Sequence, residues 1–175
     1  MLLKPHKIHL TAMSPRSTRG WVLDGPRRYP VALGRSGRRA CKREGDGATP
    51  SGTWRPVRVL YRPDRVPRPR TPLPVAAIDR SDGWCDASGD RNYNRLVRLP
   101  YPASAESLWR NDHLYDLLVV LDHNQRPRVR GGGSAIFMHL ARTGYCPTEG
   151  CIAFSDIDLR LLLARLTRAT RIVVQ

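Results

Sequence analysis

One histidine and one cysteine in the C-terminal third of the chain have the types and spacing of a catalytic pair. His139 precedes Cys151 by twelve positions, and the cysteine directly follows Gly150. A thiol is a strong nucleophile only as the thiolate, and a positioned imidazole is the usual base that generates it. A glycine at this point lets the backbone approach a substrate closely and exposes amides that can stabilise an oxyanion. The pattern predicts cysteine-dependent acyl transfer.

The same residues allow other interpretations. Cys151 could be a buried structural cysteine, and His139 a satisfied residue at the end of an apolar strand. A zinc site would use His139, Cys146 and Cys151, but the paired Cys-x-x-Cys spacing and a fourth ligand are missing. A Cys146–Cys151 disulfide would consume the nucleophile. We therefore predict that the site uses neither a metal nor another cofactor.

Composition indicates an ordinary globular protein. The 175 residues fit one domain, 1–175, and are 41% hydrophobic and 26% charged. The formal net charge is +15, and all but three of the 30 basic residues are arginine. These arginines are spread along the whole chain without a nucleic-acid-binding motif, so we expect a scattered basic surface and no nucleic-acid partner. A non-enzymatic protein that binds nucleic acid or wall polymer remains the second class of hypothesis.

The N-terminal residues do not resemble a signal peptide, because Lys4, His6, Lys7 and His9 interrupt the apolar positions. No apolar run is long enough to span a membrane. As the chain stands, we expect a cytoplasmic protein with reduced cysteines; an envelope location would require export by another route. The oligomeric state stays open.

Hydrophobic patterning predicts many short strands and one good helix. Ser155 or Asp156 can cap a helix after Cys151, with acidic residues first and Arg165 near its end. The residues between 103 and 110 are expected to form a short helix, and 34–52 and 71–94 are expected to be mostly loop. The expected strands cover 8–12, 21–23, 29–33, 54–61, 117–121, 134–140 and 171–174. The sum predicts a mainly β fold, a sandwich or open barrel with a C-terminal helix after the cysteine.

With these residues in view, the chain resembles the L,D-transpeptidase catalytic domain, the YkuD-like family of bacterial cell-wall enzymes, in a compact single-domain branch. The hallmark is an upstream histidine followed by a Ser/Thr-x-Gly-Cys turn, here His139 and 148–151. The similarity extends over nearly the whole chain, through the segments 42–52, 83–86, 93–94 and 112–116.

The resemblance implies a role for each residue of the hallmark. Cys151 would be the nucleophile and His139 its base, with the Leu140 carbonyl orienting the ring. The amides of Gly150 and Cys151 would hold the oxyanion, and Thr148 would shape the turn.

This chain departs from the commoner motif at two positions. Glu149 stands where many members have histidine, and Ala153 stands where they have an arginine that recognises the substrate carboxylate. Arg142 could supply that positive charge. Trp84 and His113, in two of the resembling segments, are further candidates for substrate binding.

The family implies a reaction on peptidoglycan stem peptides or muropeptides. Cys151 would form a thioester with a tetrapeptide stem and release D-alanine, and the amine of a second stem would then complete a 3→3 cross-link. With water as acceptor, the same site would be an L,D-carboxypeptidase that trims tetrapeptides to tripeptides in peptidoglycan recycling.

Overall fold

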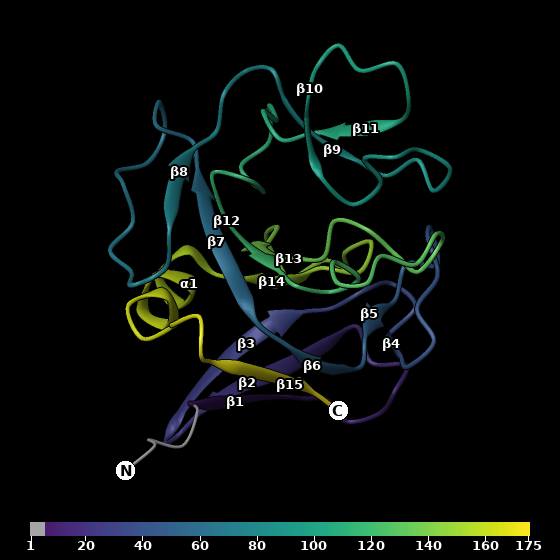
Figure 1. The fold of residues 1–175 in the computed structure, drawn as a ribbon. Coiled ribbons are helices and arrows are strands. Elements are labelled where there is room, and N and C mark those ends of the chain that lie inside the picture. Colours follow the sequence, from purple (N-terminus) through teal and green to yellow (C-terminus); the bar gives the residue numbers. More distant parts are fainter. Residues whose placement is uncertain (1–5) are drawn as a thin grey trace.

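The computed structural model describes residues 6–175, and Lys4 lies outside this range. Ten strands form one large, curled half-barrel sheet in the order β6-β15-β1-β2-β3-β14-β13-β12-β7-β8 (Figure 1). The strands of this sheet are β1 (Lys7–Thr11), β2 (Arg19–Asp24), β3 (Arg27–Ala32), β6 (Gly52–Trp54), β7 (Pro56–Tyr61), β8 (Val75–Ala77), β12 (Leu117–Leu121), β13 (Phe137–Leu140), β14 (Ile152–Phe154) and β15 (Arg171–Val174). The mainly β class with one C-terminal helix confirms the fold prediction.

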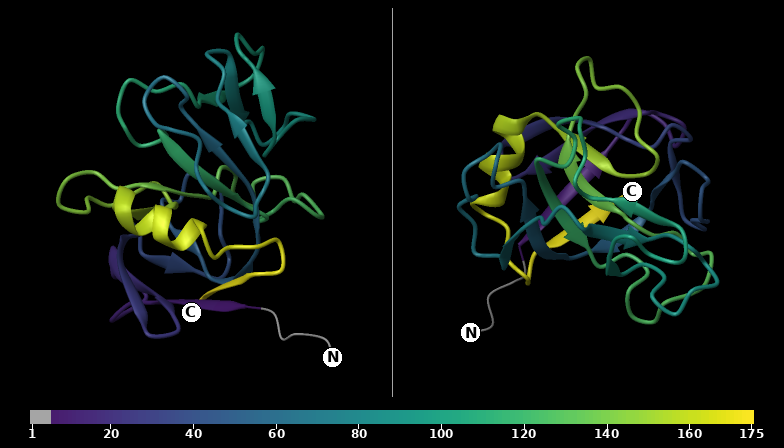
Figure 2. Two further views of the ribbon diagram at one scale, coloured as in Figure 1. Left: turned by 90° about the vertical axis from the view of Figure 1, so that its left-hand side faces the viewer. Right: turned by 90° about the horizontal axis from the view of Figure 1, so that it is seen from above.

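Two smaller sheets complete the β structure. A three-stranded sheet, in the order β10-β9-β11, contains β9 (Asp82–Cys85), β10 (Leu96–Arg98) and β11 (Ala105–Ser107). It lies at the opposite end of the molecule from β1, β2 and β15 in Figure 1 and in the left view of Figure 2. A two-stranded sheet pairs β4 (Arg38–Arg39) with β5 (Thr49–Pro50).

The central strands are buried on both faces and separate two hydrophobic cores. In β12, Leu117, Val119 and Leu121 belong to the larger core, whereas Leu118 and Val120 face the smaller one. Alternate residues of a strand point to opposite faces of the sheet, so a strand covered on both faces must be apolar throughout. The same alternation in β13 directs Met138 to the larger core and Phe137 to the smaller one.

The helix α1 (Asp156–Leu163) covers the larger core. The Ser155 hydroxyl caps it by accepting the Asp158 amide at 3.1 Å, as predicted. The helix is shorter than expected, because Ala164 already forms its C-cap and Arg165 instead pairs with buried Asp24. On its outer face Ile157 is 71% exposed.

The prediction of a short helix within 103–110 is wrong. Residues 105–107 form β11, which pairs antiparallel with β9, with Glu106 opposite Trp84. Buried Leu108 follows the strand, and its amide donates to the Asp82 carbonyl at 2.9 Å. Pairing with a distant strand therefore overrides the weak local preference for helix.

The glycine-rich loop of residues 34–52 also contains strands that were not expected, β4 and β5. Thr49 is fully buried, and its hydroxyl accepts the Gly34 amide at 2.9 Å. Gly34 forms a bridge with Thr148, so the loop is attached to the segment that precedes Cys151.

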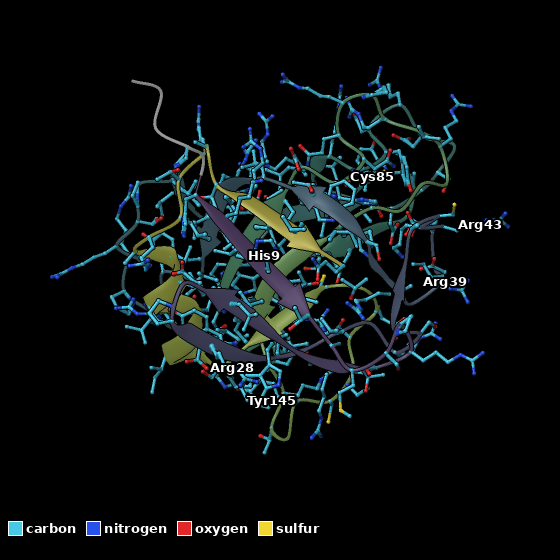
Figure 3. All side chains as sticks on the ribbon, turned by 90° about the horizontal axis from the view of Figure 1, so that it is seen from below. His9, Arg28, Arg39, Arg43, Cys85 and Tyr145 are labelled. Atoms are coloured by element: carbon cyan, nitrogen blue, oxygen red, sulfur yellow. The ribbon has the colours of Figure 1, made fainter. Side chains whose placement is uncertain are left out.

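Arginines are spread over the surface, in agreement with their distribution in the sequence. In Figure 3, Arg39 and Arg43 lie near one edge of the molecule, and Arg28 lies apart from them, where it stacks on Trp21. Between residues 6 and 175, no helix has the length and hydropathy that crossing a membrane requires.

The smaller core depends on Phe137, which is fully buried and packs edge-to-face against Trp84 at 5.1 Å and Tyr115 at 5.8 Å. Phe137→Ala should lower the free energy of unfolding by about 3–5 kcal/mol, because it leaves a cavity and removes two aromatic contacts. Leu161→Ala, on the exposed face of α1, is the control and should change it by less than about 0.5 kcal/mol. Urea unfolding followed by tryptophan fluorescence measures both; equal effects would contradict this account of the core.

Candidate active site

The pairing of β13 with β14 places the histidine and the cysteine on the same face of the sheet. The two strands are parallel, with His139 beside Ala153. Cys151 precedes Ala153 by two positions and therefore points to the same face as Ala153 and His139. Both side chains line one cavity of about 520 Å³. The structure thus brings together the two residues that the sequence singled out.

The thiol of Cys151 is held by backbone groups. Its Sγ accepts the Phe137 amide at 3.3 Å and donates to the Ala135 carbonyl at 3.2 Å. The residue is only 7% exposed, and burial raises the pKa of Cys151 from 9.0 to about 12. At neutral pH the Cys151 side chain is therefore an uncharged thiol.

The imidazole of His139 is also neutral. Burial lowers the pKa of His139 from 6.5 to about 4, outweighing the hydrogen bond that it makes through Nδ1. The Nδ1–H donates to the Leu140 carbonyl at 2.8 Å, so the lone pair is on Nε2. This is the tautomer that a general base requires.

The turn before Cys151 is closed by the hydroxyl of Thr148. It donates to the Cys151 carbonyl at 2.7 Å and accepts the Gly150 amide at 3.1 Å. Gly150 has φ +137°, and a Cβ there would lie 2.8 Å from the Ala48 carbonyl oxygen, so glycine is required. The Gly150 amide is already used within the turn, whereas the Cys151 amide has no side-chain partner within residues 6–175.

The cavity also contains a charged network that sequence reasoning missed. Tyr115 donates from its hydroxyl to Glu106 Oε1 at 2.9 Å, and Arg110 approaches the same oxygen at 3.2 Å. The Tyr115 ring packs against His139 with 5.4 Å between ring centroids. Burial raises the pKa of Glu106 and raises that of Tyr115 well above its ordinary value, so Tyr115 stays a phenol. No local motif marked Glu106, because it lies in the segment expected to be helical.

Of the three further candidates for substrate binding, the structure brings only Arg142 to the cavity. Its guanidinium is half exposed and lies 3.9 Å from Asp112. Trp84 is buried beneath the site, where it packs on Phe137 and donates to Asn94 Oδ1 at 2.9 Å. His113 is 81% exposed, pairs with Asp116 and does not line the cavity.

The four cysteines are all free thiols, with Cys146 exposed at the rim of the cavity. The part of the chain from residue 6 onward contains no group of histidine, cysteine and acidic side chains that could hold a metal ion.

Burial should make Cys151 slow to react with a simple alkylating agent. A pKa of about 12 leaves roughly a thousandfold less thiolate at neutral pH than a pKa of 9. Iodoacetamide should therefore modify exposed Cys146 before Cys151, and peptide mass spectrometry at timed intervals measures both rates. In denaturant the two cysteines should react alike; faster labelling of Cys151 in the folded protein would contradict the neutral resting state.

The burial of His139 should also make the free energy of unfolding depend on pH. Between pH 6.5 and 4 the unfolded state binds a proton that the folded imidazole does not, so the free energy of unfolding falls as the pH is lowered. This group should account for a loss of about 3 kcal/mol between pH 7 and pH 4. Urea unfolding of the wild type and of His139→Gln measures it, since the variant should lack that part of the slope. Parallel slopes would refute the neutral buried imidazole.

The comparison with known protein families agrees with this geometry. No curated protein and no solved structure matches the chain. A family model described as the L,D-transpeptidase catalytic domain, YkuD, matches residues 15–174. The curled half-barrel with one C-terminal helix is consistent with that fold. The chain therefore belongs to the YkuD family of cysteine-dependent L,D-transpeptidase catalytic domains.

Proposed function

We propose that the protein is an acyltransferase acting on peptidoglycan tetrapeptide stems, with Cys151 as nucleophile and His139 as base. The observation that carries the proposal is the shared cavity, into which one face of β13 and β14 presents both groups. The tautomer of His139 leaves Nε2 free to accept the thiol proton.

The reaction would begin when the thiol exchanges its bond to the Ala135 carbonyl for one to His139. Nε2 takes the proton as Sγ attacks the carbonyl of the L-centre, and the Cys151 amide holds the oxyanion. The tetrahedral intermediate collapses as His139 returns the proton to the departing D-alanine amine. A thioester on Cys151 remains.

The acceptor decides the product. Attack by the side-chain amine of a second stem gives a 3→3 cross-link, which is the transpeptidase reaction. Attack by water gives a tripeptide, which is the L,D-carboxypeptidase reaction. The second outcome suits a protein that acts on recycled stems in the cytoplasm, where polymer is not present as acceptor.

Tetrapeptide muropeptides test the proposal, with products identified by mass spectrometry. Cys151→Ala should abolish turnover, and His139→Gln should lower kcat by roughly 10²–10⁴-fold because the thiol loses its base. Cys146→Ala, at the rim of the same cavity, is the matched control and should retain most of the activity.

Dimers that lack terminal D-alanine would support transpeptidation, and tripeptides alone would support the carboxypeptidase. Neither product from the folded wild type would refute both. Steeply salt-dependent binding to DNA without an acyl-enzyme would favour the non-enzymatic hypothesis instead.

A further inference from the structure

Two carboxylates of the small sheet lie on the wall of the catalytic cavity. Asp86 follows β9, and Glu106 lies in β11; both line the cavity with Cys151. The register places Ala105 opposite Cys85, so Ser104 lies opposite Asp86, to which it is joined by a backbone hydrogen bond of 3.2 Å. Glu106 is two residues beyond Ser104 and thus a diagonal neighbour of Asp86 on the same face. Their proximity contributes to the raised pKa of Glu106.

The positive charge near these carboxylates does not balance them. Arg110 is shared, with a bidentate pair to Asp112 at 2.7 and 2.8 Å and a longer contact of 3.2 Å to Glu106. Arg142 faces Asp112 rather than Glu106. Asp86 makes no ion pair with any residue from 6 to 175. This wall of the cavity therefore has an excess of negative charge.

Unsatisfied polar atoms lie at the same place. Of the buried side-chain atoms without a hydrogen-bond partner in residues 6–175, two belong to cavity-lining residues, Asp86 Oδ1 and Ser134 Oγ. Ser134 is only 7% exposed. Buried polar atoms are rarely left unpaired, and a carboxylate oxygen can only be satisfied by a donor. A ligand with several N–H donors and a positive charge fits both the charge and the missing partners.

We propose that Asp86 and Glu106 bind the ammonium group of the acceptor stem and thereby direct the thioester to an amine rather than to water. The inference rests on the proposed function of Cys151 and His139. It assigns acceptor choice to the small sheet, whereas the large sheet carries the nucleophile and the base.

The protons of the acceptor can be followed through this site. The ammonium passes one proton to Glu106, whose raised pKa suits it to accept, and this proton leaves to solvent. The neutral amine attacks the thioester, so that a C–N bond forms and the C–S bond breaks. His139 takes the second amine proton and delivers it to the departing Sγ, which restores the thiol.

The test separates acceptor binding from thioester formation. The full chain is acylated with a tetrapeptide stem and offered either a second stem, whose amine is cationic at neutral pH, or hydroxylamine, which is uncharged. In Glu106→Gln and in Asp86→Asn, transfer to the stem should fall by roughly 10–100-fold, because an ionic contact is lost. Acylation of Cys151 and transfer to hydroxylamine should stay within about 2-fold of the wild type.

The two variants also control for misfolding. The Asp86 side chain makes no hydrogen bond to residues 6–175, so Asp86→Asn removes no internal contact and must give the same result if Glu106→Gln is unstable. Asp156→Asn, in the exposed first turn of α1 and paired with Arg160, should leave every rate unchanged.

Equal transfer to the stem in the wild type and in the folded variants would overturn the inference, as would a wild-type thioester that reacts only with water. Failure of the wild type to form any thioester on Cys151 would overturn the proposed function and this inference with it.

Discussion

The parallel register between β13 and β14 is the constraint on which the rest of the structure depends. Because His139 lies beside Ala153, Cys151 and the imidazole share a face of the sheet. A slip of one residue would turn the thiol into the larger core. The register is maintained from both sides, since Phe137 and Met138 fill different cores and the Thr148 hydroxyl closes the turn before Cys151.

Burial of the site determines the protonation state of its histidine and cysteine before a substrate binds. Cys151 and His139 are both uncharged at neutral pH, because burial disfavours a thiolate as well as an imidazolium. In the proposed reaction, a thiolate–imidazolium pair would therefore have to form with the help of the bound substrate, whose developing oxyanion would change the surroundings of Sγ. A resting thiol of this kind resists alkylation and oxidation, which proceed through the thiolate.

The sequence predicted those parts of the structure that are encoded locally. The apolar run at 117–121 became a buried strand, and Ser155 capped the helix, because alternation and capping depend on neighbouring residues. The placement of His139 and Cys151 on one cavity agrees with their spacing around one turn. Glu106, Arg110 and Asp86 could not be predicted as cavity residues, since strand pairing within the small sheet brings them there. The same pairing made the expected helix at 103–110 a strand.

The close approach of Gly150 to Ala48 links the turn before Cys151 to the loop that precedes Thr49. Ala48 belongs to the loop that also carries Lys42 and Glu44, and Asp46 ties this loop together through the Lys42 ammonium and the Ala48 amide. Displacement of the turn would push this loop as one piece. A substitution that shifts the turn is therefore expected to move Cys151 and the cavity-lining side chains of Lys42 and Glu44 together.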